Sequence, residues 1–99
     1  MDMNKLMQQA KELQTKVADA QAQLSETTVK GIAAGGLAIA ELDGKYNLRK
    51  LTLAPDLMKE ALDDIAAIIS AAFTDAKDKV DTLVDKVMGD ATGGMQLPS

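Results

Sequence analysis

The stretch MNKLMQQAKELQTKVADAQAQL (residues 3–24) sets the architecture, because its apolar residues recur at alternating spacings of three and four. Such a heptad seam is typical of a helix that packs lengthwise against another helix. The seam does not say whether the partner helix belongs to the same chain or to another copy. Its members are Met3, Leu6, Ala10, Leu13, Val17, Ala20 and Leu24.

The centre of the chain changes to a β pattern between turn signals. VKGIA (residues 29–33) and GLAIAEL (residues 36–42) predict two short strands, with a turn at residues 34–36. YNLRKLTL (residues 46–53) predicts a third strand. Asp43-Gly44 ahead of it suits a tight hairpin, which needs positive φ angles. The strands lack a clean alternation, which leaves open either a β-bulge or a sheet packed on both faces.

A second helical pattern follows Pro55 and continues from Leu57 to about Met88. Asp56 is a candidate N-cap, and Gly89 is a candidate stop. We therefore predict an α+β fold in the order helix, three-stranded antiparallel sheet, long helix. Residues 1–89 would form this single domain, and residues 90–99 would form a flexible C-terminal tail.

The two predicted helices are long for so small a sheet. At about 1.5 Å per residue they would measure about 35 and about 48 Å. A compact chain of about 100 residues has a radius of gyration of only about 13 Å. Their apolar seams would extend beyond the sheet and lie exposed in a monomer. We predict a symmetric homodimer with protruding helical arms, although a different partner helix would cover the seams equally well.

The chain contains neither histidine nor cysteine, which narrows its chemistry. The usual general base near neutral pH and the commonest metal ligand are absent, as are thiolate nucleophiles and disulfides. We see no signal-peptide pattern and no apolar stretch near the ~20 residues of a membrane helix. We expect a cytoplasmic, non-enzymatic protein with no cofactor, metal, membrane or small-molecule substrate.

Two features of the sequence invite other interpretations. GIAAGG (residues 31–36) is rich in glycine but lacks the Lys-Ser/Thr of a phosphate loop, so a tight turn is favoured. Four aspartates of the second helix fall close to one stripe, and hard cations bind carboxylates. Without a ligand loop, we interpret this stripe as a solvated acidic face. Its members are Asp75, Asp78, Asp81 and Asp85.

The net charge of −4 is unevenly distributed. Residues 1–54 hold seven basic and six acidic side chains, a balance of +1, and residues 55–99 hold four and nine, a balance of −5. Nucleic-acid-binding proteins usually carry a basic excess. A polyanion site in this chain must therefore concentrate a few cations in one place, and a dimer would double any such cluster.

The run from Val29 to Met58 resembles the centre of the bacterial YbaB/EbfC family of nucleoid-associated proteins. The resemblance continues in AAFTDA (residues 71–76) of the second helix, in NKLMQQAKELQ (residues 4–14) and in GMQLP (residues 94–98). It covers nearly the whole chain in order. The central motifs are Val29-Lys30-Gly31, Gly35-Gly36-Leu37, Asp43-Gly44, Asn47-Leu48-Arg49-Lys50 and Pro55-Asp56-Leu57.

This resemblance implies a tweezer-like homodimer that binds double-stranded DNA and contributes to nucleoid organisation and gene regulation. We expect phosphate contacts from first-helix lysines outside the seam, and from two cations that match the family's N-x-R-[RK] motif. The alternative is a dimeric module that recruits a protein partner through its arms without touching DNA. The candidate DNA-binding residues are Lys5, Lys11, Lys16, Arg49 and Lys50.

Overall fold

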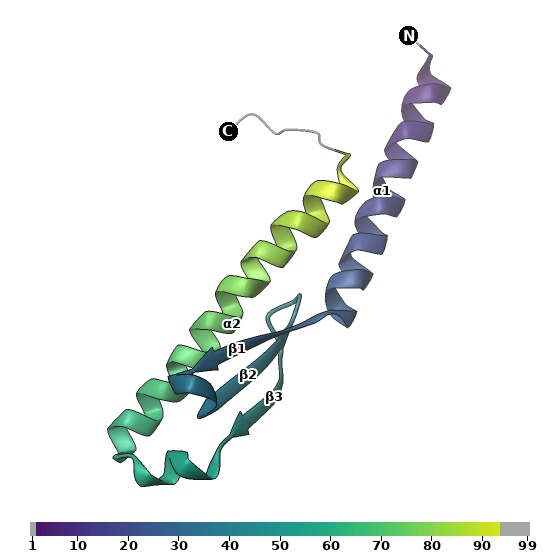
Figure 1. Ribbon diagram of the computed structural model, residues 1–99. Helices are drawn as coiled ribbons and strands as arrows, with labels where there is room; N and C mark the ends of the chain where they lie inside the picture. The colour runs from purple at the N-terminus through teal and green to yellow at the C-terminus, as the bar shows by residue number, and fades with distance from the viewer. Residues whose placement is uncertain (1, 94–99) are drawn as a thin grey trace.

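Three short strands form an antiparallel sheet in the order β1–β2–β3. They are β1 (Thr28–Ala33), β2 (Ala38–Asp43) and β3 (Leu48–Leu53). The computed structural model describes residues 2–93, and Figure 1 shows this sheet beside two helices, α1 (Met3–Glu26) and α2 (Leu62–Ala91). The predicted α+β class, element order and antiparallel sheet are confirmed.

The β1–β2 turn and the bulge of the sheet follow from local sequence, whereas the positive φ angle of the β2–β3 turn belongs to Tyr46 (66°) and not to Gly44. Residues 34–36 form a 3₁₀ turn in which Gly35 and Gly36 have positive φ angles of 67° and 100°. The pairing of β2 with β3 shifts register between Glu41 and Leu42. This bulge accounts for the irregular alternation, because one extra residue in β3 changes which face its neighbours occupy.

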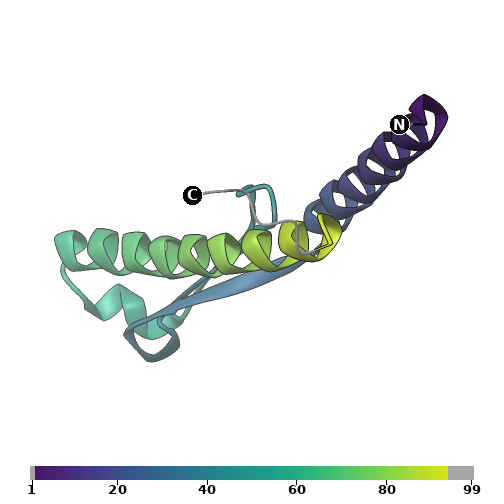
Figure 2. The ribbon, with the colours of Figure 1, turned by 90° about the horizontal axis from the view of Figure 1, so that it is seen from above.

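Helix α2 packs on β1 and β2 and leaves β3 largely uncovered. The core between them is built mainly from alanines of β2 and α2, completed by Leu42 and Val80. A Cβ at Gly31 would lie 2.0 Å from the carbonyl oxygen of Ala72 and 2.3 Å from the backbone nitrogen of Ala76. Small residues thus let the helix approach the sheet at backbone distance. Figure 2 shows α2 running over the sheet, seen from above.

The bounds of α2 differ from the predicted ones at both ends. The helix begins at Leu62 rather than Leu57, because Pro55–Lys59 forms a separate 3₁₀ turn and the next two residues are extended. It continues through Gly89 to Ala91, and the left-handed residue that follows it is Gly93, with φ 64°. Residues 90 and 91 of the predicted tail are therefore helical, and residues 94–99 lie outside the described residues.

Helix α1 packs against α2 only in its C-terminal half. Ala20 and Leu24 are buried with Val87 of α2, whereas Met3 and Leu6 of the same seam are 70% and 42% exposed. Within this chain the predicted lengthwise packing is therefore seen for one half of the seam, and cover of the other half by a second copy stays a prediction.

The unpacked half of α1 makes the molecule elongated. Its N-terminal turns extend past the end of α2, as Figures 1 and 2 both show. The molecule measures 68 × 26 × 16 Å and has a radius of gyration of 19.0 Å. A compact chain of this length would have about 13 Å. The long helices therefore extend well beyond the sheet, as their lengths predicted.

Candidate nucleic-acid interface

The three candidate lysines of α1 are all exposed and occupy two flanks of the helix. Lys5 and Lys16 are eleven residues apart and share one flank, whereas Lys11 lies about 120° away around the axis at 3.6 residues per turn. Lys5 precedes the residues of α1 that form a notch with the end of α2, and Lys11 lies on the face of α1 opposite that notch. They can therefore meet a large ligand without interference from the rest of the chain.

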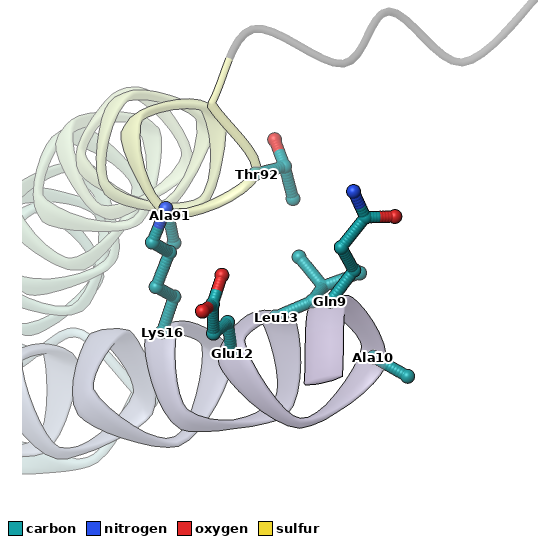
Figure 3. A pocket seen from close by; sticks show the side chains of 7 residues that line it. All are labelled: Gln9, Ala10, Glu12, Leu13, Lys16, Ala91 and Thr92. Atoms are coloured by element: carbon teal, nitrogen blue, oxygen red, sulfur yellow. The ribbon is translucent and has the colours of Figure 1, made fainter. Parts of the chain in front are cut away.

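Lys16 lies at the junction between the two helices. Figure 3 shows the notch where α1 meets the end of α2, with Lys16 and Glu12 reaching from α1 toward Ala91. The last turn of α2 carries no basic residue of its own, and helix C-termini attract cations. Lys16 of α1 is placed to supply a positive charge at this C-terminus. It can therefore stabilise the junction between the helices as well as add charge to the outer surface.

Arg49 forms a salt bridge with a buried carboxylate. Its Nε and Nη2 atoms lie 2.8 and 2.7 Å from Oδ2 of Asp43, a side chain with no exposed surface. The backbone N–H groups of Lys45 and Asn47 donate to the Oδ1 atom of Asp43 at 2.8 and 3.0 Å. The Asp43 carboxylate thus holds the β2–β3 turn together through hydrogen bonds from three residues that follow it.

This arrangement controls the ionisation of Asp43. Burial raises its pKa, but hydrogen bonds from Asn47, Lys45 and Arg49 outweigh that effect and lower the pKa to about 2. Arg49 is therefore an element of the turn as well as a surface cation, with its charge balanced by Asp43. The spacing of Asp43, Asn47 and Arg49 in the sequence was the signal that could have indicated this structural role.

Lys50 lies on the open face of the sheet, away from α2. It pairs with Glu41 of β2, which in turn pairs with Lys30 of β1. The three side chains form a Lys–Glu–Lys row across the strands. Lys30 was not among the predicted site residues, because only the strand register shows that it shares this row with Lys50. The row lies on the body of the molecule, separate from the lysines on the arm.

The cations of α2 are largely paired with its aspartates. Lys77 lies 3.5 Å from Asp81, and Lys79 lies 3.1 Å from Asp75. The N–H of Ile32 in β1 donates to Asp75 at 2.9 Å and lowers its pKa, with Lys79 contributing. Part of the predicted acidic face therefore holds the edge of the sheet.

The hydroxyl of Tyr46 donates to Asp81, and this bond raises the pKa of the tyrosine and lowers that of the aspartate. It ties the β2–β3 turn to α2. Residues 2–93 contain no group of three or more side chains suited to hold a metal ion. Over the same residues, neither helix combines the length and apolarity needed to cross a membrane.

An exposed apolar surface lies beside β3. Leu51 pairs with Ala40, whose side chain faces α2, so Leu51 points to the same side of the sheet but meets no helix there. Asp81 accepts a hydrogen bond from Tyr46, so its flank of α2 turns toward the end of the sheet where β3 begins. Phe73 precedes Asp81 by two helical turns and therefore lies on the same flank. We call the following residues the β3 surface: Leu48, Leu51, Leu53 and Phe73, which are 38–49% exposed.

The sequence comparisons agree on one family. The YbaB/EbfC DNA-binding family matches residues 1–95. A nucleoid-associated protein of Rhodospirillum rubrum is 38% identical over 101 residues, covering 98% of this chain and 92% of that protein. A nucleoid-associated protein of Xanthomonas campestris is 40% identical and covers 94% of this chain and 87% of its own length.

The fold also recurs in a solved structure. The crystal structure of an uncharacterized protein from Helicobacter pylori superimposes with a TM-score of 0.78 at 14% sequence identity. The match covers 91% of this chain and 96% of that chain. At so low an identity the similarity shows a shared fold.

Proposed function

The chain belongs to the YbaB/EbfC DNA-binding family, and from this premise we propose that it is a homodimeric nucleoid-associated protein that binds double-stranded DNA. In this proposal it catalyses no reaction, needs no small-molecule substrate, and acts in the bacterial cytoplasm on nucleoid organisation and gene regulation. The observation that carries the proposal is the family match over residues 1–95.

The β3 surface supports self-association. Large apolar side chains gathered on one exposed side of a sheet are typical of an interaction site. The two edges of the sheet also differ: α2 covers the β1 edge, where Asp75 accepts from Ile32 and Lys79 donates to the Lys30 carbonyl at 2.7 Å. Among residues 2–93 nothing comparable covers the edge at β3, and all six residues of β3 are exposed. A two-fold axis beside β3 would bury this surface against itself.

The arms support DNA contact. Residues 2–16 carry Lys5, Lys11 and Lys16 against two carboxylates, a balance of +1 in a chain whose total is −4. A dimer presents this stretch twice. Lys50 adds a cation on the open face of the sheet, and Arg49 contributes with the part of its guanidinium that Asp43 leaves free, its side chain being 55% exposed.

A gel-shift salt series tests the DNA proposal. Binding to duplex DNA should weaken linearly on a log–log plot, with a slope of about −0.9 for each phosphate neutralised. Because the dimer carries two copies of Lys11, Lys11→Gln should reduce the slope by about two such units. The matched control is Lys59→Gln, since Lys59 lies on the 3₁₀ turn beside Asp56, away from the arm. Absence of duplex binding at ~50 mM salt would exclude the proposal.

The acidic half of α2 favours one alternative, recruitment of a basic protein. Residues 75–91 carry five aspartates and three lysines, a balance of −2. A pull-down that recovers one specific protein after nuclease treatment, from a preparation that fails the gel-shift test, would support this alternative over DNA binding.

A further inference from the structure

The outer side of the free arm carries a stripe of uncharged polar groups. Asn4, Gln8 and Lys11 line a shallow groove along α1 together with Met7. These residues are exposed, and within residues 2–93 the side-chain amides of Asn4 and Gln8 donate and accept no hydrogen bond that would occupy them. Two free amides one helical turn apart therefore face the solvent in the same direction.

Lysines flank this stripe on both sides. At 3.6 residues per turn, Gln8 lies between Lys11 on one flank and Lys5 on the other, about 60° from each. Glu12 lies on the Lys5 side of the stripe and Asp2 caps the helix start, so residues 2–12 are neutral and Lys16 brings residues 2–16 to a balance of +1. The stripe thus has a neutral centre of hydrogen-bonding groups, one rim with Lys11 and another where Lys5 stands beside Glu12. Such an arrangement suits a surface whose walls are anionic and whose floor presents hydrogen-bonding groups.

The major groove of duplex DNA is such a surface. It is about 12 Å wide and accepts an α-helix, which measures about 10–12 Å across with its side chains. The arm is free to enter, since Met3 and Met7 are largely exposed and α2 ends before this part of α1. Asparagine and glutamine pair bidentately with N6 and N7 of adenine.

We propose that the free arm of α1 enters the major groove and that Asn4 and Gln8 contact adenine edges, while Lys5 and Lys11 contact phosphates on opposite walls. The inference rests on the DNA binding proposed above and adds the residues that discriminate sequence. Each bidentate contact should separate the preferred from a mismatched base pair by about 5- to 150-fold.

The test is a selection from a random duplex library, followed by competition titrations, with the full-length protein. Asn4→Ala combined with Gln8→Ala should erase the preference for adenine at the selected positions and leave the salt slope unchanged. The matched control is Gln9→Ala, which removes an amide that lines the notch facing α2. Alanine favours the helix, and circular dichroism verifies that the arm remains folded.

The outcomes separate this inference from the proposed function. Loss of preference in the double variant but not in Gln9→Ala supports the assignment. Salt-dependent binding by the natural sequence with no base preference, or a preference that survives in the double variant, overturns the assignment and leaves DNA binding intact. No duplex binding at all removes the proposed function, and the assignment with it.

Discussion

The body and the arm of this protein are built by different rules. In the body, β1, β2 and α2 meet at backbone distance, and a Cβ at Gly31 has no room beside Ala72. In the arm, residues 3–12 of α1 are exposed on every side, the apolar seam included. Packing therefore restricts which residues the body can carry. The exposed arm has no such restriction, so its residues can be those that a ligand requires. Substitutions in the two regions should change different measurements.

The largest effect on folding is expected from Gly31→Ala in the body. The new methyl group would overlap the Ala72 carbonyl and the Ala76 backbone, so helix and sheet must separate. We expect a loss of about 3 kcal/mol or more in the free energy of unfolding, measured by urea denaturation. Gly89→Ala is the control, because that position is helical and open, and it should gain up to about 1 kcal/mol.

Asp43→Asn should have the next largest effect, because the buried carboxylate accepts from Lys45, Asn47 and Arg49. An amide at this position cannot accept at both atoms, which leaves donors unpaired and Arg49 without its counter-ion. We expect the melting temperature to fall by about 5 °C or more. An unchanged melting temperature would show that the turn does not depend on this carboxylate.

The same residue predicts a pH dependence. Its folded pKa, about 2, lies below its unfolded value, so its stabilising contribution is complete above about pH 4 and is lost as the pH falls toward the folded pKa. The difference in melting temperature between the natural protein and Asp43→Asn should therefore shrink from pH 5 to about pH 2. A difference that stays constant over that range would contradict the assignment of the shift to Asp43.

The body explains how far sequence reasoning could go. Element order, hairpins and protruding helices follow from periodicity and turn residues, which are local. The end of α2 was predicted at Gly89, but a glycine can remain helical when its neighbours continue the helix, and Gly93 takes the left-handed conformation instead. No local pattern distinguishes these two glycines.

The site was harder to predict because its residues act through distant partners. Lys5 and Lys11 were identified by their position outside the seam, a local property. The buried partner of Arg49 and the Lys30–Glu41–Lys50 row depend on strand register. The β3 surface was not predicted, because the residue alternation of β3 does not reveal that α2 covers β1 and β2 but not β3.

At the boundary of the body, Leu51→Glu should act on assembly more than on folding. A charge in the β3 surface would oppose its own copy across a two-fold axis, so sedimentation at micromolar concentration should change from dimer to monomer. Thr52→Glu is the matched control, since Thr52 pairs with Ile39 and points to the other face of the sheet. A dimer that survives Leu51→Glu would place the interface elsewhere, for example on the exposed seam of the arms.

The smallest effect on folding is expected in the arm, from Lys11→Glu. Lys11 is exposed and lies on the face of α1 opposite α2, so the free energy of unfolding should change by no more than about 0.5 kcal/mol. Duplex affinity at low salt should nevertheless fall severalfold, because one phosphate contact becomes a repulsion. Equal loss of stability and affinity would mean that the arm packs against something in the dimer. A change in affinity alone would confirm that the arm is shaped for its ligand.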